Sequence, residues 1–162
     1  MSRREFIETD DLTDSHSGNA KSGNMHALID SAAIRTWMIC EQGDRWQTAT
    51  RRFITDLMPR DLVAAISPTD WDTAQRFAPV PATKGGLVLL WEVSPENLAT
   101  AMETITGVST IAPHALQLVA QQRLSSAEQA GLLELGVKTI IQAPEQLPSL
   151  RSLIHAYFRR RA

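Results

Sequence analysis

The stretch that most constrains the fold is Gly86-Leu87-Val88-Leu89-Leu90-Trp91-Glu92-Val93-Ser94-Pro95-Glu96. Its first half is a short apolar run, which a β-strand buried on both faces requires, and Ser94 followed by Pro95 is typical of a helix start. The stretch therefore predicts a central strand that feeds a helix, and we place the tip of that strand at Trp91. Because ligands of open α/β sheets bind where the strands end, Trp91 and its neighbours are the first candidate site residues.

The rest of the chain alternates between the strand and helix periods. Strands are predicted at 33–40, 62–66, 87–91, 115–120 and 137–142. A helix follows each of them, beginning near residues 44, 67, 94, 125 and 148. Alternation with short links favours parallel pairing through right-handed crossovers. We therefore predict an α/β fold, a three-layer doubly wound sheet of five parallel strands.

Capping signals set the expected helix boundaries. Asp44 is suited to cap the first helix, and Ser125 with Glu128 forms a capping-box pattern for the fourth. Gly107 is placed to end the third helix, and a last helix is expected from about Pro148.

Composition narrows the class of protein. The formal net charge of −2 gives no electrostatic reason to expect nucleic acid as a partner. Cys40 is the only cysteine, which excludes an internal disulfide and fits a reducing compartment, so we expect a cytoplasmic protein. No apolar run approaches the roughly 20 residues of a membrane span, so a membrane partner is not expected either.

Residues 1–30 differ in composition from the rest. They are rich in Asp, Ser, Thr, Gly and Asn, and five acids precede residue 15: Glu5, Glu8, Asp10, Asp11 and Asp14. Such a segment buries too little apolar surface to offset its ordering entropy. We predict a disordered N-terminal tail over 1–30 and one folded domain over 31–162. A solvated tail is favoured over an acidic docking arm.

From about Ile34 to Phe158 the chain resembles the receiver domains of bacterial two-component response regulators. The run from Leu87 to Glu96 is similar to the third-strand motif of that family, in which a phospho-accepting Asp is followed by Pro four residues later, with Trp91 in place of the Asp. The segment from Leu133 to Pro144 is similar to the family's Leu-Gly-Ala…Lys-Pro segment, with Ala143 in place of the Lys. The resemblance implies a flavodoxin-like fold.

The resemblance also assigns the remaining positions of a degenerate phosphoacceptor pocket. Glu41 and Gln42 stand at the acidic pair that would hold Mg²⁺. The hydroxyl residue of the fourth strand falls on Val119, or on Gln121 if no loop residue is inserted. Phosphoryl transfer to a receiver needs an acceptor oxygen, a cation held by carboxylates and groups that contact the transferred oxygens. An indole supplies no acceptor oxygen and no metal ligand, Gln42 replaces a second carboxylate, and Ala143 removes the cation. We therefore expect no phosphorylation by the receiver mechanism, no metal site and no cofactor.

Trp91 itself has two interpretations. It is either an apolar plug in a vacated acidic pocket, which we favour, or a lid on which a ligand stacks. Glu92 is adjacent, but side chains alternate across a strand, so it is expected to point to the opposite side. Cys40 is expected to be a small buried thiol, because no base is paired with it.

The leading hypothesis is a pseudo-receiver that acts as a signalling or regulatory protein-interaction module and is not an enzyme. By resemblance, the partner or a second copy would bind the face of the fourth helix, fifth strand and fifth helix, at about 126–158. The alternative is a small-ligand or anion sensor that uses the strand-end crevice around Glu41, Trp91 and Ser94.

Overall fold

The computed structural model describes residues 35–57, 64–79 and 85–160. The tail predicted over 1–30 lies outside the described residues, as do Ala33, Ile34, Leu62 and Val63 of the expected strands.

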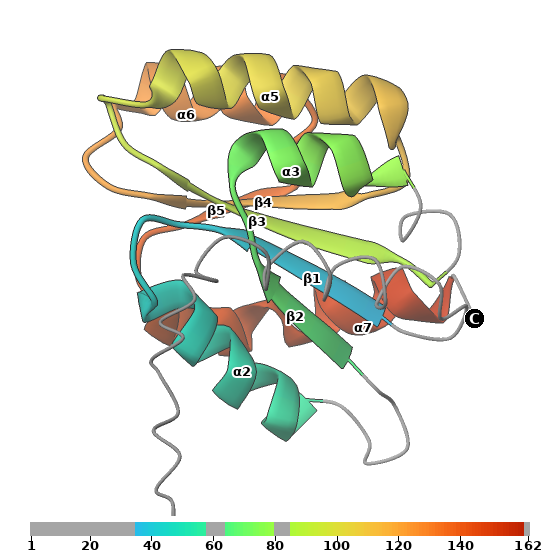
Figure 1. The fold of residues 1–162 in the computed structure, drawn as a ribbon. Helices are drawn as coiled ribbons and strands as arrows, with labels where there is room; N and C mark the ends of the chain where they lie inside the picture. The colour runs from blue at the N-terminus through green and yellow to red at the C-terminus, as the bar shows by residue number, and fades with distance from the viewer. Residues whose placement is uncertain (1–34, 58–63, 80–84, 161–162) are drawn as a thin grey trace, which may run out of the picture.

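Within these described residues, five parallel strands form one sheet in the order β2-β1-β3-β4-β5 (Figure 1). Their bounds are Arg35–Cys40 for β1, Ala64–Pro68 for β2, Leu87–Val93 for β3, Leu116–Gln121 for β4 and Thr139–Ile141 for β5. The helices are α2 (Arg45–Leu57), α3 (Trp71–Phe77), α5 (Leu98–Ile111), α6 (Ser126–Glu134), the 3-10 helix η1 (Pro144–Leu150) and α7 (Arg151–Arg159). The predicted doubly wound parallel α/β sheet is confirmed.

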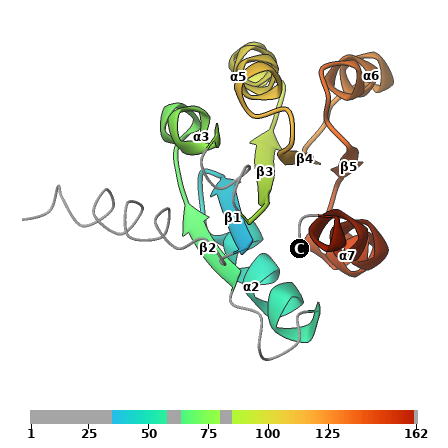
Figure 2. The same ribbon diagram turned by 90° about the vertical axis from the view of Figure 1, so that its right-hand side faces the viewer.

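The helices form layers on both faces of the sheet. Figure 2 shows α3, α5 and α6 on one side and α2 and α7 on the other. Each face has its own core because side chains alternate along a strand. Met38, Leu89 and Trp91 belong to the core under α3, α5 and α6. Trp37 and Leu90 belong to the core over α2 and α7.

β3 has side chains in both cores, as its apolar run predicts. Leu87, Val88, Leu89 and Leu90 are all at most 1% exposed. The strand does not end at Trp91, however. It continues to Val93, because Glu92 and Val93 still pair with Ala120 and Gln121 of β4. The prediction that Trp91 is the tip of the strand is therefore wrong.

The predicted start and end of the third helix are also wrong. Its counterpart α5 begins at Leu98, because the Ser94 N–H donates to Asn97 Oδ1 at 2.9 Å and holds residues 94–97 in a turn. α5 also passes through Gly107 and ends at Ile111. A Cβ on Gly107 would meet the end of the Gln75 side chain of α3, which would have to shift.

Other boundaries differ by a few residues. Ser125 and Glu128 form the expected capping box of α6, and Gly136 has the positive φ of 104° expected after a helix. The last helix is preceded by η1, so α7 begins at Arg151 and not near Pro148. β5 is confined to three residues of the predicted 137–142.

Candidate functional site

Trp91 lies within the sheet and is fully buried. Its ring stacks on Trp71 of α3, with a centroid distance of 5.1 Å and an interplanar angle of 27°. Its Nε1–H donates to Gln117 Oε1 at 3.0 Å. The full burial of Trp91 and its satisfied N–H favour the apolar plug over a lid on which a ligand stacks, and the choice between the two stays a prediction.

Gln117 extends this contact into a buried polar chain. Its Nε2 donates to Ser109 Oγ of α5 at 2.8 Å, and Ser109 Oγ donates to the Leu135 carbonyl after α6 at 2.7 Å. Side-chain hydrogen bonds thus connect β3 through β4 and α5 to the end of α6. A glutamine between two leucines near the start of β4 is the signal by which sequence reasoning could have found this chain.

Glu41 caps α2. Its Oε2 accepts from the Trp46 N–H at 2.8 Å and its Oε1 accepts from the Gln47 N–H at 2.7 Å. The first-turn N–H groups of a helix need acceptors and favour a negative charge. The predicted capping role of Asp44 is therefore taken by Glu41, and both oxygens of this carboxylate are engaged in holding the helix.

A carboxylate at the ends of the strands belongs to Glu92, the residue after Trp91. Its Oε2 accepts from the backbone N–H of Gln42 at 3.1 Å, and its Oε1 accepts from Gln122 Nε2 at 3.2 Å. Glu92 therefore bridges the loop after β1 and the end of β4. It points away from the face of Trp91, as the alternation of side chains predicts.

A polar crevice of about 400 Å³ surrounds this bridge at the carboxyl ends of β1, β3 and β4. Beside Glu92 and Gln42, its lining includes Ser94, Asn97, Glu96 and Arg123. Arg123 Nη2 lies 3.6 Å from Glu96 Oε1, and both side chains are mostly exposed. The pKa of Glu96 is lowered, first by a hydrogen bond from the Ser94 side chain and also by Arg123. The lining thus combines two carboxylates with one guanidinium.

The structure brings only one of the five predicted pocket positions, Gln42, into the lining of this crevice. Val119 is buried and pairs with Trp91 within the sheet. Ala143 precedes η1, where its N–H donates to Gln146 Oε1 at 3.4 Å. Gln121, the second option for the hydroxyl position, is buried, and its Oε1 accepts from the Leu124 N–H at 2.9 Å. Which residues correspond to the receiver pocket stays a prediction.

The crevice offers little to an anion or a metal ion. Glu41 and Trp91, named for the ligand-sensor alternative, are absent from its lining, while Ser94 is present. Glu92 and Glu96 give the lining a negative balance, which disfavours an anionic ligand. Among residues 35–57, 64–79 and 85–160, no group of three or more His, Cys, Asp and Glu side chains is placed to hold a metal ion.

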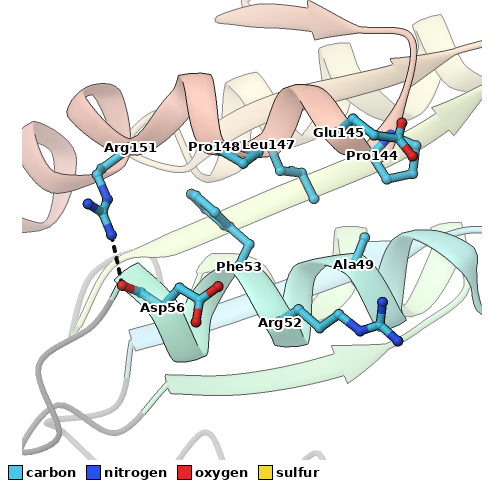
Figure 3. Close-up of a pocket in the computed structure, with 9 residues that line it drawn as sticks. All are labelled: Ala49, Arg52, Phe53, Asp56, Pro144, Glu145, Leu147, Pro148 and Arg151. Carbon is cyan, nitrogen blue, oxygen red and sulfur yellow. Dashed lines mark hydrogen bonds between the residues drawn. The ribbon is translucent and has the colours of Figure 1, made fainter.

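Two further clefts lie on the side of the sheet that carries α2 and α7. One, of about 540 Å³, separates α2 from η1, and Phe53 and Leu147 point toward each other across it (Figure 3). Arg151 Nη2 closes one end by donating to the Asp56 carbonyl at 2.8 Å. The other cleft, of about 450 Å³, lies beside α7 at the amino-terminal ends of β4 and β5.

Cys40 is fully buried at the end of β1, as expected. Burial raises the pKa of its thiol well above the usual value, and the nearby Asp70 carboxylate raises it further. A thiol held in its neutral form is a poor nucleophile, so Cys40 contributes no catalytic group. In the described part of the chain, no helix is long and apolar enough to cross a membrane.

The order of the strands and the two helical layers define a doubly wound, flavodoxin-like α/β domain with a crevice at the strand ends. No protein-family model and no curated protein matches the chain. Solved structures match its fold. The CheY-like protein TadZ from Pseudomonas aeruginosa has a TM-score of 0.60 at 13% identity, over 76% of this chain and 98% of its own.

Two more structures have the same fold. HP1043, an orphan response regulator of H. pylori, has a TM-score of 0.53 at 15% identity, over 79% of this chain and 98% of its own. The pilus assembly protein CpaE from Caulobacter crescentus has a TM-score of 0.55 at 13% identity, over 74% of this chain and 98% of its own. At these identities the likeness is one of fold, and it confirms the receiver-like fold that the sequence resemblance implies.

Proposed function

We propose that this chain is a pseudo-receiver, a regulatory module that works through protein contacts and is controlled without phosphorylation. The observation that carries the proposal is the Glu92 bridge, in which one carboxylate accepts from Gln42 N and Gln122 Nε2 across the strand ends. The Gln42 N–H and the side-chain amide of Gln122 thus already have an acceptor within the chain, the Glu92 carboxylate.

The chemistry of phosphoryl transfer supports the same conclusion. The reaction requires a carboxylate free to attack and a Mg²⁺ ion held by further carboxylates. Both oxygens of Glu92 accept hydrogen bonds, and both oxygens of Glu41 cap α2. We infer that these hydrogen bonds hold both carboxylates in place and compete with attack on a phosphoryl group and with Mg²⁺ binding, and that the domain is not an enzyme.

Intact-mass measurement tests whether the chain takes up a phosphoryl group. The full chain is incubated with acetyl phosphate and Mg²⁺, beside a receiver that has the acceptor Asp as positive control. We expect a phosphoryl adduct on the control alone. An adduct on this chain that is lost in Glu92→Gln would show that Glu92 is an acceptor, and any stable stoichiometric adduct would overturn phosphorylation-independent control.

The protein contacts that we propose use the face formed by α6, β5 and α7. Leu133 of α6 is a large apolar side chain that is 48% exposed, and Ile111 at the end of α5 is 46% exposed. Leu133 lies within the range 126–158 that the resemblance implies, and Ile111 lies outside it. The two residues make a matched pair for testing that face.

Size-exclusion chromatography with light scattering, at several concentrations, measures self-association of the full chain and of each variant. If the α6 face joins two copies, Leu133→Glu abolishes the dimer and Ile111→Glu does not. A dimer that both variants leave intact would contradict this face. A chain that is monomeric throughout would exclude the homodimer and leave a different protein as the partner.

A further inference from the structure

We propose that the cleft beside α7 binds the acidic segment 5–14 of the same chain. This inference goes beyond the proposed function, because it does not depend on whether the domain takes up a phosphoryl group.

The first observation is the charge of the cleft. Its lining includes three basic residues, His114, Lys138 and Arg160, and no acidic one. Lys138 and Arg160 are exposed, so their charges face the solvent at the rim of the cleft. The other two clefts described above each have acidic side chains in their lining. The cleft beside α7 is the one of the three suited to a negatively charged occupant.

The second observation is the apolar surface between these charges. Leu153, Ala156 and Tyr157 of α7 line the cleft and are half-buried. The Tyr157 hydroxyl is fixed by backbone atoms, since it lies 2.9 Å from the Leu87 N and O atoms and 2.8 Å from the His114 carbonyl. The cleft therefore presents a rigid aromatic ring and two aliphatic groups beneath a basic rim. An occupant that matches it carries both carboxylates and apolar side chains.

Segment 5–14, Glu-Phe-Ile-Glu-Thr-Asp-Asp-Leu-Thr-Asp, has this composition. It contains five acidic residues and no basic one, together with Phe6, Ile7 and Leu12. These three are the only large apolar side chains between residues 2 and 24. Charge and apolar groups thus occur together in the ten residues that the cleft would bind.

The third observation is where the chain enters the described structure. Arg35, the first residue of β1, places its guanidinium carbon 5.2 Å from the ring centroid of Phe158, the residue after Tyr157. Since all five strands are parallel, the start of β1 lies at the same edge of the sheet as the starts of β4 and β5. Residues 15–34 span at most about 70 Å when extended, so segment 5–14 can reach the cleft from Arg35.

The covalent link through residues 15–34 also favours the segment of the same chain over the segment of a second copy. A segment tethered through 20 residues meets its site at an effective concentration on the order of millimolar. Another copy reaches that concentration only in very concentrated solution. Binding within one chain would cover part of the face formed by α6, β5 and α7, and would regulate access to it.

Paramagnetic relaxation in the full chain tests the proposal. A nitroxide is attached to Ser15→Cys; because Cys40 is fully buried, the reagent modifies the introduced thiol. We expect strong broadening of the amides of Lys138 and Ala156, and little at Arg123 at the opposite ends of the strands. Lys138→Gln with Arg160→Gln should remove most of the cleft broadening, whereas Arg51→Gln with Arg52→Gln on α2 should leave it unchanged.

The variants separate binding from mere proximity of the tether. If the two double variants show the same broadening of the cleft amides, the charges of the cleft do not bind the segment and the proposal is overturned. A mixture of isotope-labelled chain without nitroxide and unlabelled chain with nitroxide reports contact between copies. Cleft broadening in that mixture equal to that within one chain would assign the occupant to a second copy and would also overturn the proposal.

Discussion

Replacing Trp91 with aspartate distinguishes a buried core residue from a vacated acceptor position. If Trp91 stood at an open acceptor site, Trp91→Asp would restore the residue that a receiver uses there. The structure predicts instead that the variant loses most of its stability, because Trp91 is fully buried, stacked on Trp71 and hydrogen-bonded to Gln117.

The magnitude follows from three losses. Truncating a buried aromatic side chain costs about 3–5 kcal/mol through lost burial and the cavity left behind. Gln117 Oε1 loses its indole donor, and an unsatisfied buried acceptor costs about 1–3 kcal/mol more. A carboxylate in this apolar position adds a further desolvation penalty. The total is at least about 4–8 kcal/mol, which approaches the roughly 5–15 kcal/mol by which domains are stable.

Urea unfolding followed by far-UV circular dichroism measures the effect. Trp91→Phe is the milder control, since it retains one aromatic ring but removes the N–H and the second ring of the indole; we expect it to cost at least about 1–3 kcal/mol, through the unpaired Gln117 and a small cavity, and less than Trp91→Asp. Adding Gln117→Leu to Trp91→Phe removes that acceptor and should recover part of the loss. A Trp91→Asp variant within about 0.5 kcal/mol of the wild type would refute the reasoning, because only exposed positions tolerate such a change.

Three further predictions concern single residues. Tyr157→Phe should destabilise the chain by about 1–3 kcal/mol in urea unfolding, because the hydroxyl that holds the Leu87 backbone is lost. Asp70→Ala should cost about 1 kcal/mol at neutral pH, because Asp70 caps α3. The Thr73 N–H holds the pKa of Asp70 below its usual value, so this stabilisation is present above about pH 4 and is lost as the pH falls through the lowered pKa; unfolding curves at several pH values measure the decline. Cys40 should react with a thiol reagent only at the rate of unfolding, since burial raises its pKa and closes access; fast reaction of the folded chain would contradict this.

Much of the fold could be predicted because its signals are local. The apolar run of β3 predicts a strand buried on both faces, and the Ser125 and Glu128 pair predicts the start of α6, because each depends on residues adjacent in the chain. The bounds of α5 were harder to predict. Its start depends on a local turn in which Asn97 Oδ1 accepts from the Ser94 N–H, although Ser94 followed by Pro95 is typical of a helix start. Gly107, which does not end the helix, lies against the Gln75 side chain of α3, and this contact needs the tertiary arrangement.

The candidate site shows how sensitive such reasoning is to the end of a strand. Alternation along a strand assigns Trp91 and Glu92 to opposite faces, so taking Trp91 in place of Glu92 as the site residue exchanges a crevice side chain for a core side chain. The sequence favours Trp91 as the tip because Pro95 stands at the expected offset, yet pairing with β4 carries the strand two residues further. That pairing depends on Ala120 and Gln121, nearly thirty residues away, and no local pattern near Trp91 reports it. The carboxylate that bridges the strand ends is Glu92. The proposal of control without phosphorylation therefore depends mainly on the hydrogen bonds of Glu92 and less on the indole of Trp91.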